Sequence, residues 1–192
     1  HPGYARHILV NSVKLAARFL ELLPRDSLSP ETTADRQGYV HPYAMDGGVE
    51  STVIRLLLRD FDEVGLREHE ALLRRLIGQV AAEEPRAEWS MDVRKQYRNM
   101  RQVLDGYPFV VEYADEAVRR AGLEPRRSLI RGGTDGARLT ERGLPTPNLF
   151  CGGQNHHSKL EWVSAQTMAK AVEMLVHLAV VWAERGDPTA AR

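Results

Sequence analysis

Hydrophobic residues in the first part of the chain follow a helical spacing, then a strand-like one, then a helical one again. Apolar positions recur every three or four residues over 5–23 and over 63–84, which predicts two amphipathic helices. Between them, 38–46 and 51–60 are rich in β-favouring side chains and are separated by a Gly-Gly turn. This arrangement predicts a β-hairpin between the two helices.

A further strand is predicted at 87–98, where Trp89, Met91 and Val93 alternate with polar residues. The order of elements up to this point is α-β-β-α-β. One strand placed before residue 1 would complete the ferredoxin-like β-α-β-β-α-β sandwich. We therefore expect residues 1–100 to form an α+β domain, a ferredoxin-like two-layer sandwich whose first strand is missing and whose sheet edge is open to pairing.

The pattern changes in the second part of the chain, residues 101–192. A helix is predicted over 108–121, with Val110, Ala114 and Ala117 among its inward positions. Two short apolar segments, which are typical of buried parallel strands, follow it at 127–131 and 146–151. These features predict part of an α/β domain.

Two more helices are predicted from their capping residues. A short one covers 135–142, with Thr134 or Asp135 as its N-cap, and a long one covers 165–184, with Ser164 as its cap. The apolar positions of the long helix cover most of its circumference. We therefore expect it to pack on a sheet, and we expect apolar faces to remain uncovered if that sheet is absent.

Composition narrows the range of function classes. At 43% hydrophobic and 27% charged residues the chain is typical of a globular protein. Its formal net charge of zero argues against a nucleic-acid-binding or membrane-surface protein, because both classes usually need a basic face. No signal peptide is visible, and the longest apolar run, 174–183, is too short to span a bilayer.

Two features bear on the origin of the chain. It begins with His1 rather than Met, so we expect it to be a piece of a longer protein. Cys151 is its single cysteine, which favours an intracellular, reducing setting. We interpret Cys151 as a small buried residue at a strand end rather than as a catalytic thiol.

The candidate metal ligand is His157, which follows a Gly-Gly turn and precedes Glu161 by four residues. Neutral imidazole is a common zinc ligand, although a histidine at this spacing also occurs in polar loops. His156 is expected to point outward. Glu83 and Glu84 resemble a catalytic carboxylate pair in sequence, but they end an amphipathic helix before a proline and are better interpreted as a solvated helix end.

Two arginines are candidates for binding a carboxylate. Arg131 precedes the glycine-rich loop at 132–136, whose N–H groups either bind an anion or simply form a tight turn. Arg59 ends the strand predicted at 51–60, on the same face as Arg55. Guanidinium groups bind carboxylates through two parallel hydrogen bonds, and the alternative for both residues is a surface salt bridge.

Eight segments together resemble the peptidase T family of tripeptide aminopeptidases, within the two-zinc exopeptidases that also include glutamate carboxypeptidases and succinyl-diaminopimelate desuccinylases. They span nearly the whole chain in the family's order, and the last three are long and specific. The matching segments are HPG at 1–3, VNSVKLAARFL at 10–20, SPETT at 29–33, RDFD at 59–62, YRNMR at 97–101, IRGGTDGARL at 130–139, GLPTPNLF at 143–150 and GGQNHHSKLEWVS at 152–164.

The resemblance implies a cytoplasmic metallo-aminopeptidase with a catalytic α/β domain that holds two zinc ions per subunit and an inserted lid domain that forms a homodimer. On this comparison 1–100 matches most of the lid and 101–192 matches the C-terminal part of the catalytic domain. The implied roles are a zinc ligand for His157, a substrate or oxyanion contact in the partner's site for His1, carboxylate binding for Arg59 and Arg131, and a place in the substrate pocket for Asn99.

The chain also departs from the family pattern. The family's His-x-Asp segment, its bridging aspartate and its Glu-Glu pair lie before the lid and have no counterpart here. We therefore expect a C-terminal fragment that is inactive by itself and does not bind two zinc ions tightly. The alternatives are a non-catalytic dimerisation or binding module, and a related zinc exopeptidase or amidohydrolase that acts on another substrate.

Overall fold

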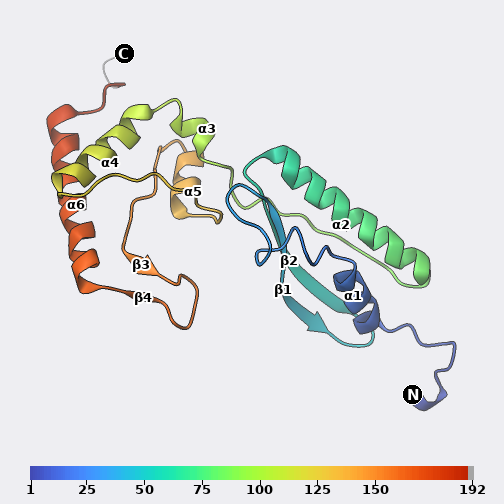
Figure 1. Cartoon of the computed structure of the whole chain (residues 1–192). Helices are drawn as coiled ribbons and strands as arrows, with labels where there is room; N and C mark the ends of the chain where they lie inside the picture. The colour runs from blue at the N-terminus through green and yellow to red at the C-terminus, as the bar shows by residue number, and fades with distance from the viewer. Residues whose placement is uncertain (190–192) are drawn as a thin grey trace. The chain divides into compact units, whose positions relative to one another are not determined.

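The chain divides by its internal contacts into two units, seen in a computed structural model that describes residues 1–189 (Figure 1). The first unit comprises His1–Lys95 and Leu129–Gly132. The second comprises Gln96–Ser128 and the chain from Gly133 onward. Among the described residues, the helices are all too short or too polar to cross a lipid bilayer.

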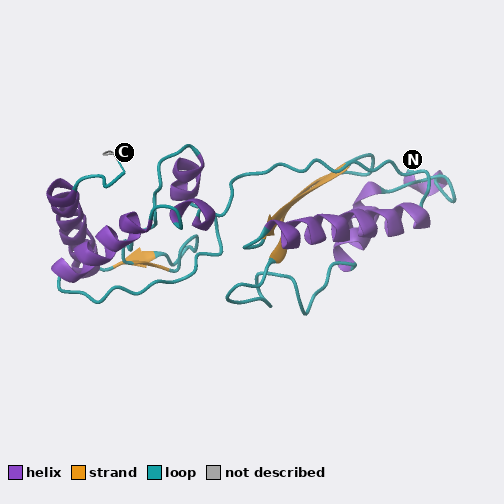
Figure 2. Cartoon of the chain, turned by 90° about the horizontal axis from the view of Figure 1, so that it is seen from above, coloured by secondary structure: helices purple, strands orange, loops and turns teal. Residues whose placement is uncertain are grey.

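The first unit is built around a β-hairpin, as predicted (Figure 2). Strands β1 (Tyr39–Gly47) and β2 (Thr52–Arg59) pair antiparallel, so that Tyr39 lies opposite Arg59 at one end, and the ladder shifts register after Pro42. The remaining elements are the 3₁₀ turn η1 (Pro2–Tyr4), α1 (Ser12–Glu21) and α2 (Glu63–Glu83).

The core of the first unit lies where the two helices meet the hairpin. Phe19 of α1, Val40 of β1 and three residues of α2 are buried together, and Val80 is fully inaccessible. The apolar face predicted for α2 is therefore the face that the structure buries, whereas Leu9 and Val13, on the face predicted for the first helix, are exposed. The buried set on α2 is Leu73, Leu76 and Val80, joined by His69.

Helix α1 is shorter than the predicted range of 5–23. Its N-cap is Asn11, whose side-chain oxygen accepts hydrogen bonds from the backbone N–H groups of Val13 and Lys14. Ahead of this cap, His7 adopts a positive φ, which breaks the helical path. The cap, rather than the apolar periodicity, decides where the helix begins.

The strand predicted at 87–98 is wrong, because this fully described segment runs without regular secondary structure. Trp89 and Met91 nevertheless pack against the core of the first unit, and the Trp89 ring lies 6.2 Å from that of Phe19. The alternation in sequence therefore marks which side chains meet the core. It does not supply the neighbouring backbone that a strand needs for its hydrogen bonds.

The second unit is mainly helical, and α4 packs against α6 within it (Figure 1). Their contact buries Ala117 and Ala121 against Met174, and the Trp182 ring stands edge-on to the Tyr113 ring at 5.1 Å. The elements of this unit are α3 (Arg101–Leu104), α4 (Pro108–Arg120), α5 (Asp135–Glu141), β3 (Gly153–Gln154), β4 (Trp162–Val163) and α6 (Ala165–Arg185).

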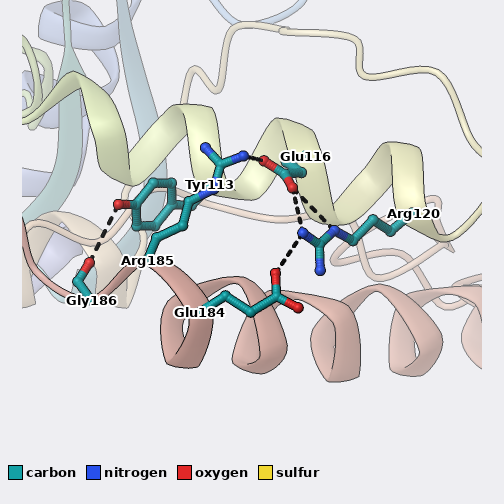
Figure 3. Close-up of polar contacts among 6 residues, drawn as sticks. All are labelled: Tyr113, Glu116, Arg120, Glu184, Arg185 and Gly186. Carbon is teal, nitrogen blue, oxygen red and sulfur yellow. Dashed lines mark hydrogen bonds and ion pairs between the residues drawn. The ribbon is translucent and has the colours of Figure 1, made fainter.

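Charged residues reinforce the contact between α4 and α6 (Figure 3). Arg120 bridges Glu116 of its own helix and Glu184 of α6, at 2.6 and 2.7 Å. Arg185 pairs with Glu116, and the Tyr113 hydroxyl donates to the carbonyl of Gly186 at 3.3 Å. Hydrogen bonding from Arg120 holds the pKa of Glu184 below its ordinary value.

Helix α6 packs on another helix, so the predicted packing on a sheet is not found among the described residues. The only strand pairing described in this unit is the two-residue ladder of β3 with β4. One side of α6 therefore meets α4, while a stripe on another side remains exposed. The large apolar residues of that stripe are Met168, Val172, Leu175, Val176 and Val180.

The parallel strands predicted at 127–131 and 146–151 are also wrong for the described chain, which has no regular structure there. Leu129 and Ile130 are about half exposed, at 50% and 48%. Cys151 is exposed as well, so the interpretation of a buried cysteine is incorrect. These segments have strand-like composition but no neighbouring strand to pair with, and side-chain preference alone does not satisfy the backbone.

Candidate functional site

Arg131 is tied to the loop that precedes β1. Its Nη1 donates to the carbonyl of Thr33 at 2.7 Å, and its Nη2 donates to Thr33 Oγ1 at 2.7 Å and to the carbonyl of Gln37 at 2.9 Å. Its guanidinium also lies 5.0 Å from the centre of the Tyr39 ring, within cation–π range. Arg131 thus joins a segment far along the chain to the start of the hairpin.

Arg59 lies at the same end of the hairpin. It is the last residue of β2 and pairs in register with Tyr39, the residue whose ring contacts Arg131. Arg59 is half-buried, and its Nη1 donates to the carbonyl of Leu58 at 3.1 Å. The structure therefore brings the two candidate carboxylate-binding arginines to the Tyr39 end of one sheet, although they lie far apart in the sequence.

His157 lies in the exposed loop between β3 and β4. Its backbone has a φ of 66°, a left-handed conformation that costs a non-glycine residue roughly 1–3 kcal/mol. Its N–H donates to Glu161 Oε2 at 3.3 Å, and the other carboxylate oxygen of Glu161 lies 3.4 Å from Nδ1 of His156. Both histidines are exposed, as expected for His156, and Glu161 holds the loop in shape.

The described residues do not by themselves fit a zinc ion. Within 1–189, no three or more histidine, cysteine, aspartate or glutamate side chains come together in a group that could hold a metal. A catalytic zinc site needs three protein ligands and an open position for water. His157 therefore stands as a single candidate ligand in this part of the molecule.

The last two candidates each support a local turn. Nδ1 of His1 accepts from the N–H of Gly3 at 3.1 Å, which caps η1, and the imidazole lies 5.3 Å from the ring of Tyr4. In the other unit, Asn99 Oδ1 accepts from the N–H of Arg101 at 3.0 Å, at the start of α3. His1 is exposed.

Glu83 and Glu84 act as ion-pair partners at the end of α2. Arg18 contacts Glu83 at 3.0 Å, and Arg86 contacts Glu84 at 2.6 Å. Hydrogen bonds from these arginines lower the pKa of each carboxyl group below its ordinary value. Both glutamates are therefore ionised partners of surface arginines, in keeping with the solvated helix end expected from the sequence.

One pair near the arginines was not predicted from the sequence. His69, on the apolar face of α2, places Nε2 3.2 Å from Oδ2 of Asp60, the residue that follows Arg59. The two side chains are only 9% and 13% exposed. The signal available in the sequence was a histidine within an otherwise apolar helix face, and nothing in the spacing identified its partner.

Several known proteins that are similar in sequence to this chain are named peptidase T. No protein-family model matches the chain. The chain is 43% identical over 178 residues to peptidase T from Aeromonas hydrophila, an alignment that covers 93% of this chain and 44% of that protein. It is 41% identical over 186 residues to peptidase T from Serratia proteamaculans, covering 96% of this chain and 45% of that one.

A third relative and a solved structure agree with these. Peptidase T from Bacillus subtilis is 38% identical over 179 residues, or 93% of this chain and 43% of that protein. The crystal structure of aminopeptidase PepT from Bacillus cereus matches with a TM-score of 0.64 at 20% identity, covering 95% of this chain and 48% of that one, which supports the fold alone. The chain spans less than half the length of each of these relatives.

Proposed function

Because the chain is homologous to peptidase T along nearly its whole length, as its motifs predicted, we propose that it is the C-terminal part of a zinc-dependent aminopeptidase that releases the N-terminal residue of tripeptides. The observation that carries this proposal is identity of 38–43% across 93–96% of the chain. A cytoplasmic location belongs to the same proposal.

We assign residues 1–100 to the lid and residues 101–192 to the C-terminal part of the catalytic domain. The hairpin with α1 and α2 packed against it supports a ferredoxin-like lid, because these are four consecutive elements of that sandwich. The apolar segment at 146–151 supports a partial α/β domain, since it has the composition of a strand that needs neighbours. The lid is proposed to form a homodimer.

The two arginines are proposed to bind the carboxylate end of the peptide. Their common position at the Tyr39 end of the hairpin supports this role, because guanidinium groups bind carboxylates through two parallel hydrogen bonds. Arg131 already donates to Thr33 and Gln37, so a carboxylate would have to displace one of these contacts. Asn99 is proposed to lie in the substrate pocket.

His1 is proposed to contact a substrate oxygen in the partner subunit's site. This role is supported by the exposure of His1. Among the described residues, its imidazole has no buried partner that would hold the ring inward. His157 is proposed to be one zinc ligand of the parent enzyme, where the metal would supply Lewis-acid chemistry. Because His157 stands alone among the described residues, we propose that these 192 residues by themselves bind zinc weakly and do not hydrolyse tripeptides.

Activity assays of the full-length protein against a tripeptide, a dipeptide and an N-acyl amino acid test this function. We expect release of the N-terminal residue from the tripeptide to be preferred. A preference for the N-acyl amino acid would instead indicate a related amidohydrolase. Titration calorimetry of the 192-residue chain with zinc is expected to show no tight binding of two ions.

The role of Arg59 is tested by replacing it with alanine in the full-length protein. The KM for tripeptides is expected to rise, because the substrate loses a charge-assisted contact worth about 1.5–3 kcal/mol. Arg55→Ala is the matched control, since Arg55 lies on the same strand and is exposed. Equal KM values for the Arg59 variant and the unmodified enzyme would reject this role.

A binding module without catalysis is the second candidate, and it is favoured by the lack of a metal-binding cluster among residues 1–189. On this reading the chain contributes only dimerisation and substrate contacts. Absence of peptidase activity in the full-length protein, together with retained dimerisation, would support the module over the enzyme.

A further inference from the structure

Arg59 is followed directly by Asp60, a mostly buried acidic residue whose partner is a histidine on the neighbouring helix. Asp60 is 13% exposed, and its Oδ2 lies 3.2 Å from Nε2 of His69. The two atoms are close, but their geometry is not that of a well-aligned hydrogen bond. Removing a carboxylate from water is costly unless polar partners compensate for it. The placement of Asp60 against His69 therefore needs a physical explanation.

The other oxygen of Asp60 fixes the turn that leads into α2. Oδ1 accepts from the N–H of Asp62 at 3.2 Å, and Asp62 in turn caps α2 by accepting from the N–H of Gly65 at 2.8 Å. The carboxylate of Asp60 therefore ties the end of β2 to the start of α2 and, through His69, to the second turn of that helix.

Two glycines leave just enough room for this pair. A Cβ added at Gly38 would lie 2.1 Å from Asp60 Oδ2 and 2.4 Å from His69 Nε2, and one added at Gly65 would lie 2.2 Å from Asp60 Oδ2. Contacts this short cannot exist without a shift of the structure. Gly38 also precedes Tyr39, which lies opposite Arg59 in the sheet, so the backbone before β1 and the first turn of α2 both lie against the pair.

We propose that Asp60 and His69 form a positioning pair that holds Arg59 in the orientation needed to bind the free carboxylate of the substrate, and so determines selectivity for peptides with an unblocked C-terminus. This inference rests on the proposed role of Arg59. A two-point guanidinium–carboxylate contact depends strongly on angle, so a small rotation of the residue weakens it.

The test compares a tripeptide with its C-terminally amidated form as substrates of the full-length enzyme. Asp60→Asn keeps the shape of the side chain and removes its charge. We expect KM for the free tripeptide to rise about tenfold with kcat nearly unchanged, and the preference for the free acid over the amide to shrink by about the same factor. Asp62→Asn is the matched control, because it removes a charge on the same turn and retains capping ability.

His69→Gln provides a second variant in case Asp60→Asn does not fold, and it should lower the acid-over-amide preference in the same way. If whichever of these variants folds leaves that preference unchanged, or if Asp62→Asn lowers it equally, the positioning role is wrong. A purely structural weakening would act on both substrates alike and would not change the ratio.

Arg59→Ala separates this inference from the function on which it rests. If Arg59→Ala leaves the acid-over-amide preference intact, the proposed role of Arg59 itself fails. If Arg59→Ala abolishes the preference and Asp60→Asn has no effect on it, only the positioning pair fails. Adding Asp60→Asn to Arg59→Ala should change the preference no further, whereas additive effects would show that Asp60 acts independently of Arg59 and would overturn the proposal.

Discussion

Replacing Met174 with alanine is expected to destabilise the contact between α4 and α6 more than any comparable change on the same helix. Met174 is fully buried against Ala117 and Ala121, with Val118, Leu149 and Leu178 packed around them. The side chains of Ala117 and Ala121 are too short to fill the space that a truncated Met174 would leave. Substitutions of this kind cost about 2–5 kcal/mol, and we expect about 3 kcal/mol here.

The measurement is urea unfolding followed by the fluorescence of Trp182. Its ring contacts those of Phe109 and Tyr113 between α4 and α6, so its emission reports on this contact. The chain has three tryptophans, and replacing Trp89 and Trp162 with phenylalanine leaves Trp182 as the only one. With a denaturant slope of about 2 kcal/mol per molar urea, a loss of about 3 kcal/mol lowers the midpoint by about 1.5 M.

Leu175→Ala is the matched control for this experiment. Leu175 is the next residue on α6, carries a side chain of similar size and is 50% exposed. We expect its truncation to cost about 1 kcal/mol or less, because only part of its surface is removed from water on folding. Equal shifts for the two variants, or a larger shift for Leu175→Ala, would refute the packing face that we assign to α6.

Two further predictions concern the second unit. Because Cys151 is exposed, its thiol should react with an aromatic disulfide reagent in the folded chain nearly as fast as in urea, and strong protection in the folded chain would contradict its placement. Because hydrogen bonding from Arg120 holds the folded-state pKa of Glu184 below 4.5, its stabilising effect is present above about pH 4.5 and is lost as the pH falls through the lowered value. Glu184→Gln should therefore reduce the loss of Trp182-monitored stability between about pH 5 and about pH 3, and an undiminished loss would contradict this pairing.

The helices were predictable because their causes lie within a few residues of one another. Helix α2 begins after Asp62, and α5 and α6 begin after Thr134 and Ser164, each of which caps its helix through a side-chain oxygen. The exceptions are α1, whose start was predicted at residue 5 from apolar spacing but lies after Asn11, and the short helix α3, which was not predicted. Where periodicity and a capping residue disagreed, the cap was correct, because it satisfies backbone N–H groups directly.

The hairpin was predictable for the same reason, and the remaining strands were not. Strands β1 and β2 are adjacent in sequence and joined by a short turn, so each supplies the other's hydrogen-bonding partner. The segments at 87–98, 127–131 and 146–151 would need partners from elsewhere in the chain. Their apolar alternation describes side chains, whereas a strand is defined by its backbone pairing.

By itself, the sequence determined the local features of this protein: the capped helices, the hairpin turn, the apolar faces and the motifs that show its resemblance to peptidase T. Only the tertiary structure decided which distant residues meet. It brought Arg131 to the Tyr39 end of the hairpin, where β2 ends at Arg59, placed Asp60 against His69, and set α6 on α4. Capping and periodicity act over one or two turns of chain, while these contacts depend on the global path of the backbone.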